Sequence, residues 1–162
     1  YHGVGQGNSI SLSSDPLLNQ WRQLPSNPVV PDPKDRPAIA NETDRDSEGG
    51  APYASWDPHG WVEGDTYYAI FGGKRPAVFK AAELNEWSYV GDLFGTYLPD
   101  VSKSEDVSCP DFFTLGGKKV LLCISHHLGC RYYVGTWKDE KFYPENHACM
   151  SFADNTFFAP NF

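Results

Sequence analysis

Two acidic residues that lie beside prolines are the residues of this chain best suited to chemistry. Asp57 lies in Trp56-Asp57-Pro58-His59-Gly60-Trp61, and Asp111 lies 54 residues later in Ser108-Cys109-Pro110-Asp111-Phe112-Phe113. Aromatic rings offer faces on which sugars pack, and glycosidic bonds are cleaved by paired carboxyl groups about 5–10 Å apart. The spacing predicts acids at matching points of a repeated unit, collected around one pocket for sugar chemistry. The side chains that we expect to contact the sugar are Trp56, His59, Trp61, Ser108 and Asp111.

A simpler interpretation of these acids is available at each position. Proline holds Asp57 in extended backbone, but Asp-Pro pairs are also common in turns, and we interpret Asp15-Pro16 as such a turn. Glu105 and Asp106, just upstream of Asp111, lie beside Lys103 and Ser104 and could equally form a solvated acidic loop.

The elements that position these residues are predicted to be antiparallel β-strands. Segments rich in aromatic and β-branched residues alternate with glycine-containing turns, as hairpins require. The predicted strands are 66–71, 77–80, 87–90, 112–115, 119–124, 131–137 and 141–143. The one short helical pattern is 80–87, and the polar segment 30–53 is interpreted as a long surface connection.

Internal repeats indicate how the strands are organised. Leu18-Asn19-Gln20-Trp21 recurs 66 residues later as Leu84-Asn85-Glu86-Trp87, and 67–71 and 120–124 occupy equivalent places 53 residues apart. A blade of a β-propeller takes about 40–50 residues, so two to three blades fit. A two-sheet sandwich is the alternative fold.

Composition excludes several classes of function. The chain has 162 residues, 15% of them aromatic, and a net charge of −8 that argues against a nucleic-acid partner. No apolar run is long enough to span a membrane. The four cysteines and five histidines lack metal-ligand spacing, and no phosphate-binding loop follows a strand, so no metal and no cofactor is predicted. The compartment is left open, with a secreted or periplasmic protein favoured over a cytoplasmic one, and the oligomeric state is not predicted.

Taken together, these motifs resemble glycoside hydrolase family 32, which contains invertases, fructan hydrolases and fructosyltransferases. Trp56-Asp57-Pro58 is similar to the family's Arg-Asp-Pro motif, and residues 107–113 are similar to its Glu-Cys-Pro-Asp region. Residues 5–10 with 15–18 resemble its second blade, and 150–152 with 157–160 resemble the stretch leading into its fourth blade. The resemblance covers nearly the whole chain.

The resemblance implies a fold, a mechanism and a missing part. The family fold is a five-bladed propeller followed by a β-sandwich, so we expect residues 1–162 to form about blades two to four, with the first blade and the sandwich absent. The family mechanism uses an Asp nucleophile on the first blade in an Asn-Asp-Pro motif, a Glu acid/base, and a transition-state stabiliser that Asp57 matches. We therefore expect the chain alone to be inactive.

Two positions depart from the family pattern. Trp56 stands where the family has Arg, and Ser108 stands in register with the acid/base Glu. Serine cannot protonate a leaving group at neutral pH, so Glu105 or Asp106 is the expected replacement. Asp106 shares a strand face with Ser108, whereas Glu105 has the longer reach but needs a bulge.

The resemblance implies a retaining β-fructofuranosidase that acts on sucrose, levan or inulin without a cofactor. Transfer of the fructosyl unit, as in a fructosyltransferase or levan fructotransferase, is the same chemistry with another acceptor. A related glycosidase for arabinose or xylose polymers is disfavoured by Ser108-Cys109-Pro110-Asp111. A non-catalytic sugar-binding propeller is the alternative that Ser108 favours.

Overall fold

Every regular element in the described part of the chain is a β-strand, as the sequence predicts. The computed structural model describes residues 2–3, 7–31, 52–150 and 159–160. Neighbouring strands are antiparallel throughout. The strands are β1 (His2–Gly3), β2 (Gly7–Asn8), β3 (Ser11–Leu12), β4 (Arg22–Gln23), β5 (Trp56–Glu63), β6 (Thr66–Gly72), β7 (Ala77–Ala81), β8 (Ser88–Asp92), β9 (Ser108–Leu115), β10 (Lys118–Ser125), β11 (Gly129–Lys138) and β12 (Lys141–Cys149).

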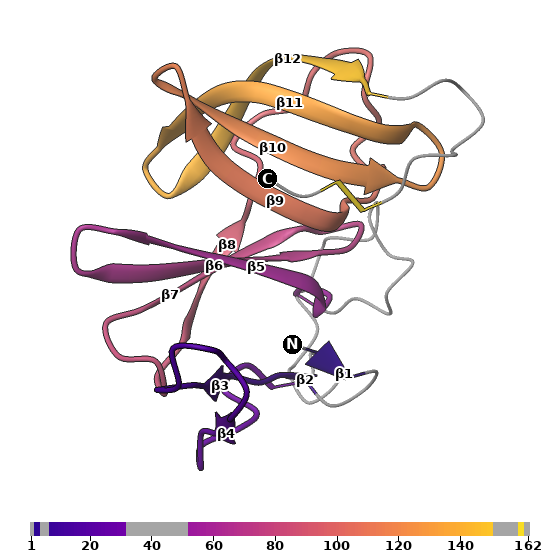
Figure 1. Ribbon diagram of the computed structural model, residues 1–162. Helices are drawn as coiled ribbons and strands as arrows, with labels where there is room; N and C mark the ends of the chain where they lie inside the picture. The colour runs from indigo at the N-terminus through magenta and orange to yellow at the C-terminus, as the bar shows by residue number, and fades with distance from the viewer. Residues whose placement is uncertain (1, 4–6, 32–51, 151–158, 161–162) are drawn as a thin grey trace.

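Two four-stranded sheets form the body of the molecule, and each is a simple meander. One has the order β5-β6-β7-β8 and the other β12-β11-β10-β9, and Figure 1 shows the second sheet lying above the first. In each sheet a two-residue turn joins the first strand to the second, at Gly64-Asp65 and at Gly116-Gly117. Gly64 and both glycines of the second turn have positive φ, which glycine adopts without steric cost.

The repeats predicted from the sequence occupy equivalent places, with one adjustment. Thr66 and Lys118 begin the second strand of each sheet, 52 residues apart and not 53. The two Leu-Asn-x-Trp segments precede β4 and β8 and form the same turn, because each Trp Nε1–H donates to the carbonyl three residues earlier. The distance is 2.7 Å for Trp21 to Leu18 and 2.9 Å for Trp87 to Leu84. The predicted helix over 80–87 is therefore wrong, since strand and turn occupy these residues.

The sheets pack face to face through a layer of apolar side chains. Ile70, Val78 and Leu93 of the β5–β8 region meet Phe112 and other side chains of the β9–β12 sheet, all of them buried. On the far face of the β5–β8 sheet, a second cluster includes Val30. Burial of about 25 cal/mol per Å² of apolar surface makes this stacking a main source of stability, and it sets β5 against β9.

A close backbone approach fixes the segment that leads into β9. Gly73 and Val107 exchange two backbone hydrogen bonds of 2.7 and 3.0 Å. A Cβ on Gly72 would lie 2.2 Å from the carbonyl oxygen of Val107, so only glycine permits this approach. The contact holds Val107, and with it the polar residues on either side, against the neighbouring sheet.

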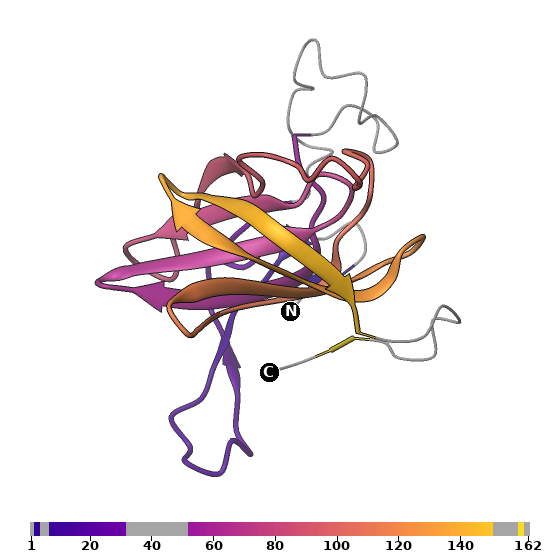
Figure 2. The same cartoon turned by 90° about the horizontal axis from the view of Figure 1, so that it is seen from above.

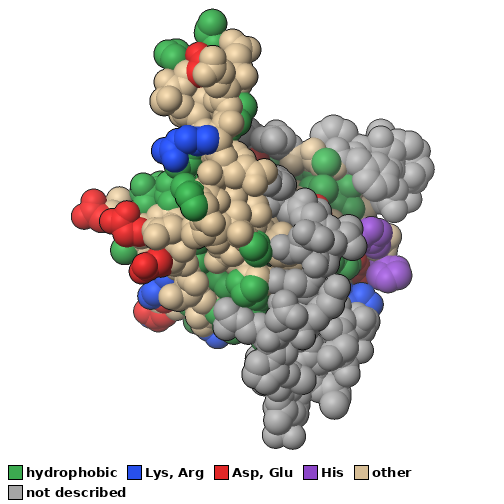
Figure 3. All heavy atoms as spheres, turned by 90° about the horizontal axis from the view of Figure 1, so that it is seen from below, with side chains coloured by type: hydrophobic (Ala, Val, Ile, Leu, Met, Phe, Trp, Pro, Cys, Tyr) green, Lys and Arg blue, Asp and Glu red, His purple; other side chains and the backbone are tan. Residues whose placement is uncertain are grey.

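The β3–β4 hairpin projects from the stack of sheets, as Figure 2 shows. Leu17, Leu18 and Trp21 near its tip are exposed, and Figure 3 shows some hydrophobic side chains toward the end of the projecting part. Asp15 forms the predicted turn here, since its carboxylate accepts backbone N–H groups of Leu17 and Asn19 at 2.9 Å each.

Several expectations concern residues outside the described part of the chain. These are most of the predicted surface connection 30–53 and the family-like residues 5–6, 151–152 and 157–158. In the residues that are described, no helix has the length and apolar character needed to cross a membrane.

Candidate active site

The first residues of β5 and of β9 have the same backbone shape. Asp57 and Cys109 both have positive φ, 41° and 46°, and each precedes a proline. The strand register also shifts at both places. Asp57 therefore matches Cys109, and Asp111 matches His59, so the prediction that the two acids occupy matching points is wrong by two residues. Both acids lie inside the first strand of their sheet, whereas the predicted strands began only at residues 66 and 112.

The side chain of Asp57 reaches across to the neighbouring strand. Its Oδ2 accepts the backbone N–H of Cys109 at 3.0 Å and faces the Cys109 Sγ at 3.7 Å. Burial, followed by the Asp57 charge, raises the pKa of the Cys109 thiol, which is therefore neutral. Both residues line a cavity of about 210 Å³ that also involves Pro58, His59, Pro110, Asp111, Ala159 and Pro160.

His59 of β5 and Asp111 of β9 form a pair between the same two strands. His59 Nδ1 lies 2.9 Å from Asp111 Oδ1, and its Nε2 lies 3.1 Å from the carbonyl oxygen of Phe112. Both nitrogens face acceptors, so the ring makes both bonds only when protonated. Burial is the largest influence on this group and lowers the pKa of His59 in spite of the Asp111 charge. The predicted sugar contacts His59 and Asp111 thus line the cavity while bonded to each other.

The two tryptophans predicted to stack on sugar have different surroundings. Trp61 lies between His59 and Tyr68, with ring centroids 6.3 and 5.3 Å away in stacked geometry. These neighbours cover part of the ring, which is partly buried in the layer between the sheets, and its contact with sugar stays a prediction. Trp56 is 38% exposed, and its ring centroid lies 6.5 Å from that of His126. Trp56 is thus the one of the two that is exposed at the surface.

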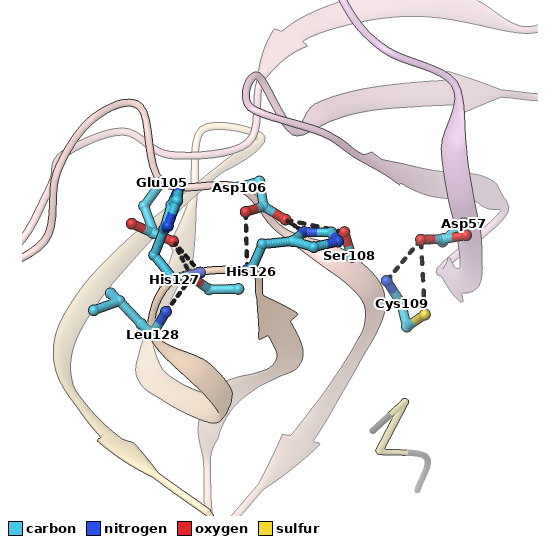
Figure 4. Close-up of polar contacts among 9 residues, drawn as sticks. Asp57, Glu105, Asp106, Ser108, Cys109, His126, His127 and Leu128 are labelled. Atoms are coloured by element: carbon cyan, nitrogen blue, oxygen red, sulfur yellow. Dashed lines mark hydrogen bonds and ion pairs between the residues drawn. The ribbon is translucent and has the colours of Figure 1, made fainter. Parts of the chain in front are cut away.

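The predicted acid/base candidates flank Val107 at the start of β9. Ser108 Oγ donates to Asp106 Oδ2 at 3.0 Å, so these two side chains share a face, as predicted. Asp106 also accepts both His126 Nδ1 at 2.6 Å and the His126 backbone N–H at 3.0 Å. Glu105 instead accepts the Ser125 hydroxyl. Figure 4 shows Glu105 on the far side of Asp106 and His126 from Asp57.

Asp106 is held as a carboxylate. Burial, the largest influence, opposes its ionisation, but hydrogen bonds from the His126 ring, the His126 backbone and Ser108 together outweigh it and lower the pKa of Asp106. A carboxyl group in this state accepts protons poorly and has none to donate at neutral pH.

Sequence reasoning missed the role of His126 in this cluster. The histidines were judged only by their lack of metal-ligand spacing, but residues 126–128 form the turn between β10 and β11. The turn brings His126 back over Asp106, 20 residues earlier in the chain. A signal was present in Ser125-His126-His127-Leu128-Gly129, where polar residues and a glycine between two strands indicate a loop.

The residues that the structure describes contain neither a cluster of potential metal ligands nor a disulfide. No group of three His, Cys, Asp or Glu side chains within them is arranged to hold a metal ion. Cys109, Cys123, Cys130 and Cys149 are free thiols, and burial raises the pKa of Cys123 and Cys130.

Comparison with known proteins decides the family. Residues 6–162 match the model of the glycosyl hydrolases family 32 N-terminal domain. The chain belongs to glycosyl hydrolase family 32. Because this domain is a β-propeller, the two four-stranded sheets are blades, and β5 and β9 are their first strands.

Curated relatives of this family 32 chain are sucrose-6-phosphate hydrolases. One from Zymomonas mobilis subsp. mobilis is 27% identical in an alignment 112 residues long, which covers 55% of this chain and 22% of that protein. Another, from Escherichia coli, is 32% identical in an alignment 72 residues long, which covers 41% of this chain and 14% of that protein. The matched region thus spans less than a quarter of the length of these relatives.

Proposed function

We propose that this chain is part of a β-fructofuranosidase-type glycosidase that releases terminal fructosyl units from sucrose or fructans with retention of configuration. The observation that carries the proposal is the placement of Asp57. Its carboxylate lies in a cavity between the first strands of two blades and is fixed by the Cys109 N–H. A family of glycosidases and a positioned carboxylate together favour glycoside cleavage.

Asp57 acts in this proposal as the transition-state stabiliser. A glycosidic bond breaks through a state with positive charge on the sugar ring. A carboxylate bonded to ring hydroxyls strengthens those bonds as this charge develops, and it needs no reorganisation because the backbone already holds it. The positive φ of Asp57 aims the side chain toward β9 and not along its own strand.

The nucleophile is proposed to lie outside this chain. The family mechanism places it in an Asn-Asp-Pro motif, and none of the three Asp-Pro pairs here, at Asp15, Asp32 and Asp57, follows an asparagine. We propose that a further blade, N-terminal to these residues in the whole protein, supplies that carboxylate.

The substrate is proposed to present a neutral fructosyl unit to the cavity. The described lining contains Asp57 and Asp111 but neither Lys nor Arg. An acidic lining binds hydroxyls and repels phosphate, which favours an unphosphorylated sugar at this position. The relatives named above are sucrose-6-phosphate hydrolases, so the phosphorylated disaccharide is the natural comparison substrate.

A sugar-binding protein without turnover is the second candidate, and Ser108 is the observation that favours it. A hydroxyl that donates to Asp106 at 3.0 Å stands where the family has its acid/base carboxyl. Without another proton donor near this position, the propeller would bind sugar but not cleave it. Fructosyl transfer differs from hydrolysis only in the acceptor.

The test uses the whole protein that its gene encodes. Sucrose, sucrose 6-phosphate, inulin and levan are supplied separately, and released fructose is measured, with NMR used to assign the configuration of the first product. We expect fructose release with retention of configuration. Binding of these sugars by calorimetry without release or transfer would establish the sugar-binding alternative, and release of arabinose or xylose from their polymers would replace the proposed substrate class.

A further inference from the structure

An exposed imidazole held by a buried carboxylate lies beside the candidate site. His126 Nδ1 lies 2.6 Å from Asp106 Oδ2, while the backbone N–H of the same residue donates to Asp106 Oδ1 at 3.0 Å. The carboxylate therefore fixes both the ring and the turn that holds it. The His126 side chain is 65% exposed, and that of Asp106 is 5% exposed.

The orientation of the ring leaves one nitrogen available for chemistry. Asp106 accepts a hydrogen bond from the Nδ1–H, which fixes the tautomer of the neutral ring with Nε2 unprotonated. Among the described residues, none makes a hydrogen bond to Nε2. The side chain thus combines a fixed orientation with an accessible basic nitrogen, the arrangement by which a carboxylate and a histidine form a general base.

Neither acidic residue predicted from the sequence is as well placed. Both oxygens of Asp106 are occupied by donors, and it is almost wholly buried. Glu105 accepts the Ser125 hydroxyl and lies near the His127 backbone N–H at 3.4 Å, away from Asp57. Asp106 can orient a neighbour, but His126 is the group that reaches solvent.

The position of His126 also fits a leaving group. Its ring centroid lies 6.5 Å from that of Trp56, the residue next to Asp57. Ser108, which shares the Asp106 carboxylate with His126, is the residue before Cys109, which binds Asp57. A sugar bound by Asp57 would extend past Trp56, which is exposed, toward His126.

We propose that His126, positioned by Asp106, is the general acid and base of this site in place of the carboxyl group that Ser108 replaces. This inference rests on the proposed function. His126 would be the catalytic residue, and Asp106 would act through it as a positioning residue.

The two half-reactions balance. In the first, the carboxylate nucleophile bonds to the anomeric carbon, the bond from that carbon to the glycosidic oxygen breaks, and protonated His126 gives its Nε2 proton to that oxygen, so an alcohol leaves. In the second, neutral Nε2 takes a proton from water, the resulting hydroxide oxygen bonds to the anomeric carbon, and the nucleophile leaves as a carboxylate.

The test compares His126→Gln with His127→Gln in the whole protein, assayed on sucrose. His127 lies in the same turn and serves as the matched control. We expect His126→Gln to lower kcat/KM on sucrose by about 100- to 10,000-fold, the usual contribution of a general acid/base, and His127→Gln to leave it unchanged. On p-nitrophenyl fructoside, whose leaving group needs no proton, the His126→Gln variant should form the covalent intermediate rapidly and accumulate it.

Added imidazole should restore turnover to His126→Gly, and Asp106→Asn should lower kcat with little change in KM and shift the pH profile. If His126→Gln unfolds, His126→Asn is the second variant, because its amide N–H can still donate to Asp106 while no basic nitrogen remains.

Each contrary outcome has a distinct meaning. His126→Gln with the activity of His127→Gln would overturn the inference while leaving the proposed function intact, as would an inactive Glu105→Gln beside an active His126→Gln. A folded His126→Asn that keeps the wild-type kcat/KM, after an unfolded His126→Gln, would also overturn it. A wild-type protein that cleaves no fructoside would remove the proposed function, and the inference with it.

Discussion

The first residues of β5 and of β9 have the same backbone conformation but different side chains. Residues 56–59 of β5 and 108–111 of β9 each combine a left-handed residue, a following proline and a shift of strand register. At the left-handed position β5 has Asp57, whereas β9 has Cys109, whose main contribution is a backbone N–H. A repeated backbone thus provides a carboxylate in one blade and the donor that fixes it in the next.

The comparison shows that blade repetition supplies geometry while single substitutions supply chemistry. At the next matched pair, His59 faces Asp111 at 2.9 Å, so complementary residues again occupy equivalent places. The residues proposed for proton transfer are not part of this repeat. Asp106 lies in the connection before β9, and His126 lies in the turn after β10. Loops on a rigid scaffold are where functional residues commonly lie.

Among the tests of this comparison between β5 and β9, the largest effect is expected from changing the Asp57 carboxylate. Asp57→Asn in the whole protein keeps an oxygen for the Cys109 N–H but removes the charge, so kcat/KM on sucrose should fall by about 100- to 1,000-fold. Cys109→Ala at the matched position should change it by less than about tenfold, because the bond uses the backbone. Steady-state kinetics of both variants check this, and equal losses would mean that β5 and β9 do not divide the roles as described.

A smaller effect tests how the start of β9 is held against the β5–β8 sheet. Gly72→Ala places a Cβ 2.2 Å from the Val107 carbonyl oxygen and should destabilise the domain by about 1–3 kcal/mol. Gly60→Ala is the control, because its Cβ would lie 3.5 Å from the nearest atom, which is ordinary contact. Urea denaturation measures both. Gly72→Ala with the stability of Gly60→Ala would contradict the close packing of this connection.

The smallest expected effect concerns pH. Because the folded state lowers the pKa of Asp106 below its ordinary 3.8, the carboxylate stabilises the fold above that pH, and this contribution is lost as pH falls through the folded pKa. The melting temperature of the wild type should therefore fall more steeply below about pH 4 than that of Asp106→Asn. If the melting temperatures of the two proteins fell equally as the pH was lowered, the contacts of Asp106 would not favour its ionised form.

The sequence predicted the strands better than the site. Segments such as Thr66–Gly72 are rich in aromatic and β-branched residues, and the structure places strands there. β5 was missed because its Asp-Pro-His-Gly segment has the composition of a turn, although interblade packing of Trp61 holds it extended. The acids were matched by residue type, whereas proline and positive φ set the true equivalence.

The site depends on contacts that spacing does not encode. The prediction that Asp106 and Ser108 share a face followed from the strand period of two and is confirmed. The pairing of Asp106 with His126 needs the turn at 126–128 to fold back over the start of β9, a tertiary contact with no local signature. The partial covering of the Trp61 ring likewise follows from how two blades stack.

The central claim is that the fructosyl unit binds where the first residues of β5 and β9 meet, and a crystal structure tests it most directly. Whole protein with Asp57→Asn is crystallised and soaked with sucrose. We predict the fructosyl ring in the cavity lined by residue 57, Pro58 and Cys109, with the glycosidic oxygen directed past Trp56 toward His126 Nε2. Sucrose bound away from this cavity, with the cavity itself empty, would contradict the account.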